Sequence, residues 1–273
     1  PTLRFDTLRI VPAPSARLGL KIFQADVETA FLYPDIDKEL YLDISDPGLR
    51  KMFGLHDTLV LKLRKALYGL VQSPYLWSEG FRKSLEKLGF ESVHEGPCCF
   101  IKKHNGELVI LLLYVDDIVV LTKNTATFDW LLSHLEKEYN LTSSPVQLVL
   151  GAQIQQDLSR GTIHLNQTAF IERIKSRFHE HLAGTPPQDT PIKPKFNFEG
   201  KEVKGCVPST QCPTSDQEKA LMAKLPYRQL LCSMLYVSIF TRPDIIHAIS
   251  QLAQVMSNPS KLHWHMVLGL ASY

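Results

Sequence analysis

The chain has 273 residues, 44% hydrophobic and 21% charged, so it can bury a sizeable core as one large domain or two small ones. This composition excludes wholesale disorder, collagen and a small disulfide scaffold. The net charge is +2, divided into −2 for residues 1–150 and +4 for residues 151–273. Five cysteines with no C-x-x-C pair predict a reducing, intracellular setting without disulfides or a zinc site.

The first half of the chain predicts strands interrupted by two helices. Pro12 and Pro14 are expected to break any helix within residues 1–18. A helix from Pro74 to about Leu88 carries one buried apolar stripe. Asn105-Gly106 predicts a hairpin turn. Strands are expected at residues 20–27, 39–44, 59–63, 98–102, 108–115 and 118–122, and a helix capped by Thr125 or Thr127 follows them.

The second half predicts a hairpin over residues 146–166 and then mostly helices. Residues 184–216 hold six of the 17 prolines, which is typical of a linker. Two histidine pairs, His179/His181 and His263/His265, are expected at the surface because no acidic or cysteine partner is spaced to join them in a metal site. Helices are expected from Phe170 to Leu182 and at residues 227–240, 244–256 and 261–273.

Two adjacent carboxylates interrupt the apolar run LLLYVDDIVVL at residues 111–121. Successive strand residues point to opposite faces, so Asp116 and Asp117 can share a site only at the tip of a hairpin. Two like charges ~4 Å apart repel by about 4 kcal/mol at an effective dielectric of 20. The pair therefore indicates either a proton or cation site, or ordinary turn residues in water.

Asp26 also ends an apolar strand and is a third candidate carboxylate. Oxygen ligands without nearby histidine or cysteine suit a hard divalent ion such as Mg²⁺. Three carboxylates from two strands can hold two ions in the arrangement used for phosphoryl transfer. The alternative for Asp26 is an ordinary residue at a strand end.

Six motifs in the same order along the chain resemble the reverse transcriptase domain of copia-type LTR retrotransposons, from the Gag-Pol-like polyprotein of such elements. The resemblance extends from about residue 20 to the end. The motifs are QADVETAFL at residues 24–32, LRKALYGLVQSP at 63–74 followed by Trp77, YVDD at 114–117, Leu150-Gly151 before Gln153-Ile154, Tyr227-Arg228, and TRPDI at 241–245.

The resemblance implies an α+β fold: a right-hand polymerase palm, built as a split β-α-β antiparallel sheet with helices on one face, plus a thumb and a helical connection region, with the fingers largely missing. The expected divisions are an N-terminal fingers remnant (1–19), the palm (20–140), a thumb-like hairpin and helix (141–183), a proline-rich linker (184–216) and a truncated connection segment (217–273). We therefore expect a piece of a longer polypeptide. No segment predicts a membrane span, and the resemblance places the protein in cytoplasmic particles or the nucleus.

The resemblance also implies a reaction, RNA-directed DNA polymerisation on an RNA or DNA template-primer with dNTPs. In that reading Asp26 and Asp116 would ligate two Mg²⁺ ions, with Mn²⁺ as a substitute, and Asp117 would complete the acidic cluster. Residues expected at the nucleotide are Val27, Phe31, Gln72 and Tyr114. Residues expected at the nucleic acid are Lys62, Arg64, Lys65, Leu150 and Gly151.

Several of these residues also have a plain structural interpretation. Phe31 would be a core aromatic, Gln72 a polar residue at a helix start, and Gly151 a bulge glycine. Lys62 and its basic neighbours would form a solvated edge strand. The TRPD segment is itself a good helix opening, with a capping hydroxyl and proline in the first turn.

Three departures from the family pattern are visible. Only about 25 residues precede Asp26, Tyr33-Pro34 replaces the usual Asn-Gly, and Gly96 replaces an aspartate. Three functional hypotheses follow: a DNA polymerase, an inactive retroelement remnant that binds nucleic acid, and a two-metal phosphohydrolase or nuclease.

Overall fold

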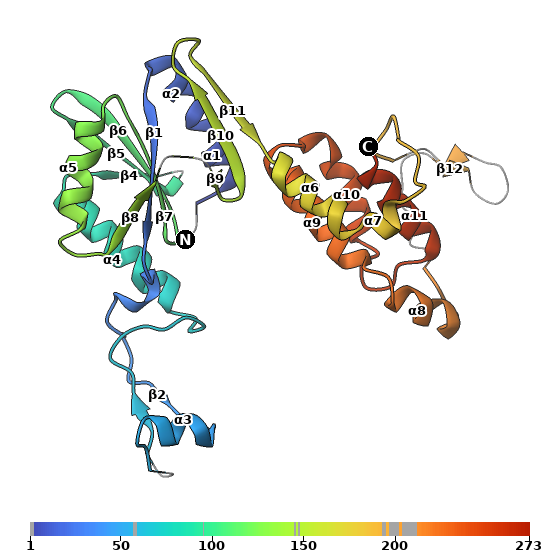
Figure 1. The fold of residues 1–273 in the computed structure, drawn as a ribbon, viewed down its shortest axis with the longest axis horizontal. Coiled ribbons are helices and arrows are strands. Elements are labelled where there is room, and N and C mark those ends of the chain that lie inside the picture. Colours follow the sequence, from blue (N-terminus) through green and yellow to red (C-terminus); the bar gives the residue numbers. More distant parts are fainter. Residues whose placement is uncertain are drawn as a thin grey trace. The chain divides into compact units, whose positions relative to one another are not determined.

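The computed structural model describes residues 3–56, 59–94, 96–144, 146, 148–192, 195–196, 202–203 and 212–273. The chain divides into two compact units (Figure 1). Unit 1 consists of Pro1–Val149 and Gln155–Ile163, and unit 2 consists of Leu150–Ile154 and His164–Tyr273. The mixed architecture of helices and antiparallel sheets agrees with the predicted α+β class.

A six-stranded sheet forms the centre of unit 1. All of its pairings are antiparallel, and the strand order is β4-β5-β6-β7-β1-β8. Asn105 and Gly106 both have positive φ, as the predicted hairpin turn between β5 and β6 requires. The strands are β1 (Lys21–Val27), β4 (Glu91–Val93), β5 (Gly96–His104), β6 (Glu107–Tyr114), β7 (Asp117–Thr122) and β8 (Leu141–Ser144).

Two long helices cover one face of this sheet. They are α4 (Ser73–Lys87) and α5 (Thr125–Leu135), which is capped by Asn124 rather than by either predicted threonine. Phe23 of β1 stacks on Phe128 of α5 with ring centroids 4.6 Å apart. Because side chains alternate along a strand, Phe23 faces the helices and the neighbouring Gln24 and Asp26 face the opposite side.

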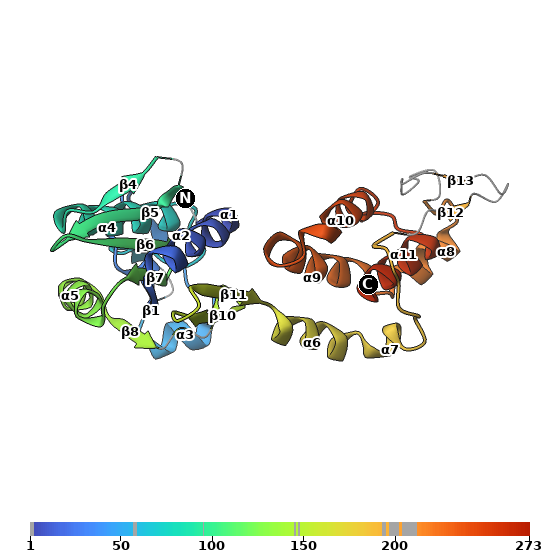
Figure 2. The ribbon, with the colours of Figure 1, turned by 90° about the horizontal axis from the view of Figure 1, so that it is seen from above.

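The opposite face of the sheet is partly covered by α1 (Phe5–Ile10) and α2 (Pro12–Leu18), which lie on the side away from α5 (Figure 2). The expectation that Pro12 and Pro14 exclude helix here is wrong. Pro12 is the first residue of α2, where an amide hydrogen has no intrahelical acceptor and the fixed φ of proline suits the helix. With apolar cover on both faces, β6 and β7 are apolar at nearly every position.

Residues 30–72 link β1 to α4 and include an arm that extends from the sheet (Figure 1). The segment contains a 3₁₀ turn η1 (Ala30–Leu32), a short hairpin of β2 (Tyr41–Leu42) and β3 (Leu61–Lys62), and helix α3 (Pro47–Met52). Both strands are shorter than the predicted 39–44 and 59–63. Arg50 of α3 donates to Asp43 at 2.7 Å and to the His56 carbonyl at 2.7 Å. These bonds hold the segments before and after α3 together.

A small sheet of order β11-β10-β9 occupies the predicted hairpin region, where the chain passes from one unit to the other. Its strands are β9 (Leu148–Val149), β10 (Ala152–Asp157) and β11 (Thr162–Asn166). Within unit 1, the Gln156 side chain accepts a hydrogen bond from the Ile22 amide at 3.2 Å and donates to the Leu20 carbonyl at 2.6 Å. These bonds join β10 to the start of β1.

Unit 2 is built from helices around an apolar core that includes Leu230, Ile249 and Val267. Its longest helix, α9 (Tyr227–Phe240), has the predicted bounds. The other elements are α6 (Thr168–Arg177), α7 (His179–Leu182), β12 (Lys195–Phe196), β13 (Glu202–Val203), α8 (Asp216–Ala223), η3 (Pro243–Ile245), α10 (Ile246–Ala253) and α11 (Lys261–Ala271). Much of the predicted linker 184–216 lies outside the described residues.

The expectation that His263 lies at the surface is wrong. Its side chain is fully buried at the start of α11, where Nδ1 accepts a hydrogen bond from the Ser260 amide at 3.0 Å, while Ser260 caps the helix. Histidine thus takes the role that glutamate or glutamine has in a capping box. Among the helices that the structure describes, none has the length and hydrophobicity to cross a bilayer.

Candidate active site

The three predicted carboxylates lie at the same end of the six-stranded sheet, Asp26 and Asp117 on facing strands and Asp116 in the adjoining loop. Tyr114 and Asp117 close the β6–β7 hairpin, so its loop consists of Val115 and Asp116. Asp26 of β1 lies directly opposite Asp117 of β7. Directly opposed residues of antiparallel strands project on the same face, so these two carboxylates share the face away from α4 and α5. The prediction that Asp116 and Asp117 lie at the tip of a hairpin is confirmed.

The loop between β6 and β7 adopts a backbone conformation that its sequence disfavours. Val115 has φ of 57°, whereas Asp116 is not among the residues of positive φ. This pattern is that of a type II′ turn, which favours glycine at the position that Val115 occupies. A β-branched residue in this region carries strain of about 1–3 kcal/mol.

Two hydrogen bonds from different elements hold this loop. The buried Trp77 indole of α4 donates to the Val115 carbonyl at 2.6 Å. The Val27 amide, next to Asp26, donates to the Asp116 carbonyl at 2.9 Å. The second bond ties the acidic loop to the strand that carries the third carboxylate.

The carboxylates influence one another electrostatically. Partial burial raises the pKa of Asp26, and the negative charges of Asp116 and Glu28 raise it further. Burial also raises the pKa of Asp117, with smaller contributions from Asp116 and Asp26, while a hydrogen bond from Gln24 opposes the rise. Gln24 Nε2 donates to Asp117 Oδ1 at 3.4 Å. The site therefore favours a positive charge that neutralises it.

The donor chemistry of the site fits a hard divalent cation. In the described part of the chain no group of three or more His, Cys, Asp or Glu side chains is arranged to hold a metal ion. Mg²⁺ commonly binds through one or two carboxylates, with substrate phosphates and water completing its octahedron. Asp26 and Asp116, whose charges act on each other, are the residues that would hold it.

The residues expected at the nucleotide have mixed placements. Tyr114 contacts Phe5 of α1 with ring centroids 6.5 Å apart, on the face that carries the carboxylates. Phe31 packs against the exposed Tyr68 at 4.9 Å. Gln72 is the residue before α4, and its side chain makes no capping hydrogen bond. Val27 is buried on the helix-covered face, so only its backbone is directed at the acidic loop.

The predicted basic residues lie near the arm, and two of the three form ion pairs. Lys62 contacts Glu39 at 2.6 Å, and Lys65 contacts Asp35 at 2.8 Å. Arg64 is exposed between them. Surface pairs of this kind are weak, so phosphate groups can compete for both lysines.

Leu150 and Gly151 form a tight turn in unit 2. Leu150 has φ of 50° and Gly151 has φ of 77°. The Tyr236 hydroxyl of α9 donates to the Leu150 carbonyl, and a Cβ at position 151 would lie 2.6 Å from that hydroxyl. The structure therefore explains the glycine by backbone conformation and by the packing of Tyr236.

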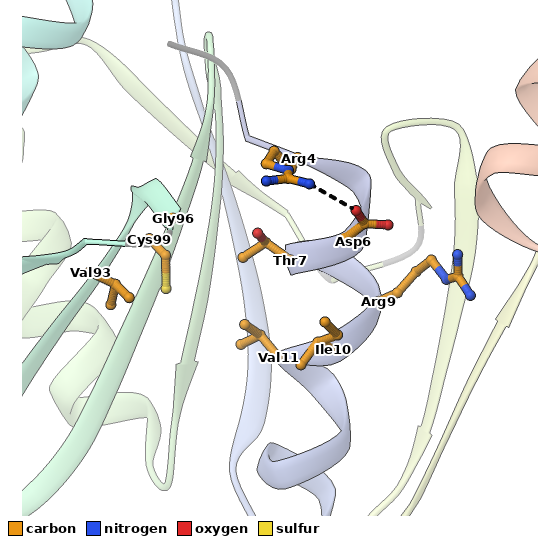
Figure 3. Close-up of a pocket in the computed structure, with 9 residues that line it drawn as sticks. All are labelled: Arg4, Asp6, Thr7, Arg9, Ile10, Val11, Val93, Gly96 and Cys99. Atoms are coloured by element: carbon orange, nitrogen blue, oxygen red, sulfur yellow. Dashed lines mark hydrogen bonds and ion pairs between the residues drawn. The ribbon is translucent and has the colours of Figure 1, made fainter.

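A groove of about 640 Å³ lies between α1 and the β4–β5 edge of the sheet (Figure 3). Thr7 of α1 faces Cys99 across the groove, Arg4 lies just before α1, and the Arg9 side chain points away from Cys99. Arg4 is paired with Asp6 at 3.4 Å. The groove is on the same sheet face as Asp26, because Cys99 alternates with the helix-facing Phe100.

Sequence reasoning missed three residues that shape the site. Gln24 orients Asp117, Trp77 holds the Val115 carbonyl, and Tyr33 contacts the Trp77 ring at 6.1 Å. Alternation along β1 could have identified Gln24, since residues two apart share a face. No local pattern could have identified the other two contacts.

Comparisons with known proteins identify the family of this chain. The family model described as reverse transcriptase (RNA-dependent DNA polymerase) matches residues 1–194. A retrovirus-related Pol polyprotein from transposon TNT 1-94 of Nicotiana tabacum is 31% identical over all of this chain and 20% of its own length. The Pol polyprotein from transposon RE1 of Arabidopsis thaliana is 27% identical over all of this chain and 17% of its own length.

A yeast relative extends the comparison. The transposon Ty1-DR1 Gag-Pol polyprotein of Saccharomyces cerevisiae is 28% identical over 92% of this chain and 14% of its own length. The chain thus spans about a fifth or less of these polyproteins. The resemblance to copia-type elements drawn from the motifs is confirmed, and the chain belongs to the reverse transcriptase family of retrotransposon Pol polyproteins.

Proposed function

We propose that this chain is the catalytic part of an RNA-directed DNA polymerase that adds dNTPs to the 3′ end of a primer paired with an RNA or DNA template. The observation that carries the proposal is the placement of Asp26 opposite Asp117, with Asp116 in the adjoining loop. Burial and the nearby charge of Asp116 raise the pKa of both Asp26 and Asp117, so these carboxylates are costly to keep charged, which argues for a positively charged ligand. Family membership supports a metal-bound nucleotide as that ligand.

The proposal assigns a polymerase subdomain to each region of the chain. Residues 20–140, which hold the carboxylates, would form the palm. Residues 141–183 would form a thumb-like hairpin and helix, and 217–273 a connection segment after the 184–216 linker. The sheet face on which Asp26 and Tyr114 lie, which α1 and α2 cover only in part, would receive the template-primer.

Asp26 and Asp116 would hold two Mg²⁺ ions, for which Mn²⁺ can substitute. When bound, these ions lower the pKa of the primer hydroxyl and neutralise the triphosphate. The primer 3′ oxygen then bonds to the α-phosphorus as the bond from that phosphorus to the leaving pyrophosphate breaks. Asp117, oriented by Gln24, would keep the local potential negative without being a principal ligand.

The nucleotide contacts are proposed from the same resemblance. Phe31, supported by Tyr68, would pack beneath the sugar, and Gln72 would line the pocket. Lys62, Arg64 and Lys65 would contact phosphates, exchanging their surface ion pairs for the nucleic acid. Leu150 and Gly151 would place the primer backbone.

A primer-extension assay tests the proposal. A labelled primer on an RNA template is incubated with the chain, dNTPs and Mg²⁺, and parallel reactions contain EDTA or the Asp116→Asn variant. A polymerase lengthens the primer only in the complete reaction, and a phosphohydrolase or nuclease shortens it. A remnant without activity binds the duplex in a mobility-shift assay and leaves the primer unchanged.

A further inference from the structure

We propose that Trp77 is a positioning residue for the acidic loop: its indole hydrogen bond to the Val115 carbonyl keeps Asp116 beside Asp26 in a backbone conformation that valine disfavours. The effect on catalysis rests on the proposed polymerase function, whereas the effect on the loop does not. Trp77 lies on α4, far from the carboxylates in the sequence, and touches none of the reacting groups.

The first argument concerns the two anchors of the loop. Val115 and Asp116 are the only loop residues, and each carbonyl accepts one hydrogen bond from outside the hairpin. The Val27 amide fixes the Asp116 carbonyl to β1, and the Trp77 indole fixes the Val115 carbonyl to α4. Without the second anchor, Val115 is free to leave φ of 57° and to rotate the peptide that precedes Asp116.

The second argument concerns how firmly the indole is held. Trp77 is 2% exposed, and its ring contacts Phe81 at 5.2 Å and Tyr139 at 5.4 Å. Tyr33 packs on both Trp77 and Tyr139, and its hydroxyl accepts a hydrogen bond from the Asn140 amide at 2.6 Å. This aromatic cluster joins α4 to the segment after α5 and leaves the indole one orientation.

The third argument concerns the hydrogen-bonding requirement of the indole itself. The buried indole donor needs an acceptor, and the Val115 carbonyl supplies it. The loop and the tryptophan therefore stabilise each other.

The test compares Trp77→Phe with the matched change Trp130→Phe on α5, at a site distant from the loop. Phenylalanine keeps a ring in the aromatic cluster but removes the donor. We expect kcat for dNTP incorporation to fall roughly 10–100-fold in Trp77→Phe with little change in KM for dNTP, because the loss is one of ligand orientation. Trp130→Phe should retain the parent kcat.

A second measurement uses the metal-free chain and needs no activity. In hydrogen-exchange mass spectrometry, peptides spanning residues 112–118 of Trp77→Phe should exchange roughly fivefold faster, as expected for the loss of one hydrogen bond. Peptides from β5 should be unchanged. If exchange rises but every variant including the parent fails to extend a primer, the proposed function fails and the positioning role stands.

The strongest control is rescue. Glycine accepts positive φ without strain, so adding Val115→Gly to Trp77→Phe should restore part of the lost kcat. Should Trp77→Phe not fold, Tyr33→Asn tests the same support, with a smaller loss of kcat and the same local rise in exchange. Unchanged kcat and unchanged exchange in folded Trp77→Phe, or a loss equal to that of Trp130→Phe, would overturn the proposal.

Discussion

The two ends of strand β6 are closed by turns of opposite character. At one end Asn105-Gly106 places its two positive-φ residues in a loop whose sequence favours them. At the other end Val115-Asp116 has a valine where glycine is favoured, and bonds from Trp77 and Val27 hold it. The same strand thus carries one turn that its own residues stabilise and one that the rest of the unit must hold.

The difference shows where unit 1 tolerates strain. A cost of about 1–3 kcal/mol is a substantial part of the roughly 5–15 kcal/mol by which domains are stable. It occurs at the turn that carries the carboxylates, whose mutual repulsion is a second cost at the same place. A strained backbone and mutually repelling charges at the same position are typical of functional sites.

Exchanging the turns is the most demanding test of this difference. The double variant Val115→Asn, Asp116→Gly gives both ends of β6 the same loop. We expect urea unfolding to show equal or higher stability, while primer extension falls by roughly 10²–10³-fold or more, because a charge-positioning group is gone. The conservative change Asn105→Asp at the other end should alter neither quantity.

The Leu150-Gly151 turn in unit 2 provides a second test, because an aromatic side chain also donates a hydrogen bond to a carbonyl of that turn. Gly151→Ala meets both a positive φ of 77° and the Tyr236 hydroxyl, 2.6 Å from the new Cβ. We expect the free energy of unfolding to fall by about 2–3 kcal/mol. Gly184→Ala, at φ of 79° in open space, should cost only about 1 kcal/mol in the same measurement.

A smaller effect is expected when the favourable turn of β6 is made unfavourable. Gly106→Val introduces a β-branched residue at φ of 82°, with no atom within 4 Å of the new Cβ to hold the turn. Thermal unfolding should show a loss of about 1–2 kcal/mol. The specific activity of the folded protein should stay at the parent value, and a drop in kcat would show that this turn also serves the site.

The smallest expected effect concerns the repulsion itself. Asp117 has a pKa raised above its ordinary 3.8 in the folded chain, so its charged form is disfavoured there. Asp117→Asn should therefore raise metal-free stability at pH 7.5 by roughly 1 kcal/mol or less. Below pH 3.8 both folded and unfolded carboxyls are protonated and the gain should vanish. Asp129→Asn, at an exposed position of α5, is the control.

Local patterns predicted much of the fold and the identity of the acidic site. The Asn105-Gly106 hairpin and helix α9 are encoded by neighbouring residues, and both have their predicted form. Helices α1 and α2 are not predicted by their sequence, because proline disfavours a helix interior, whereas Pro12 occupies the first position of α2, where proline is favourable. The burial of His263 is not predictable from local spacing, because it depends on the hydrogen bond from the Ser260 amide and on the packing of the surrounding unit 2 core.

The site shows the same limit more clearly. Spacing placed Asp26 at a strand end and Asp116 at a hairpin tip, but the facing register of β1 and β7 comes from tertiary pairing. The contact of Trp77 with Val115 joins residues 38 positions apart. Sequence periodicity reports which face a residue occupies, and it carries no information on which distant carbonyl an indole will meet.

The partial burial of Asp26 and Asp117 has a consequence for the choice of counterion. Dissolved monovalent salt screens exposed charges over a Debye length of about 8 Å at physiological ionic strength, but it acts much less on charges withdrawn from water. Sodium or potassium in the surrounding buffer therefore does little to reduce the repulsion between these carboxylates. A small ion of higher charge density that gives up part of its hydration shell can neutralise them, so the burial of the carboxylates contributes to the choice of cation as much as their number does.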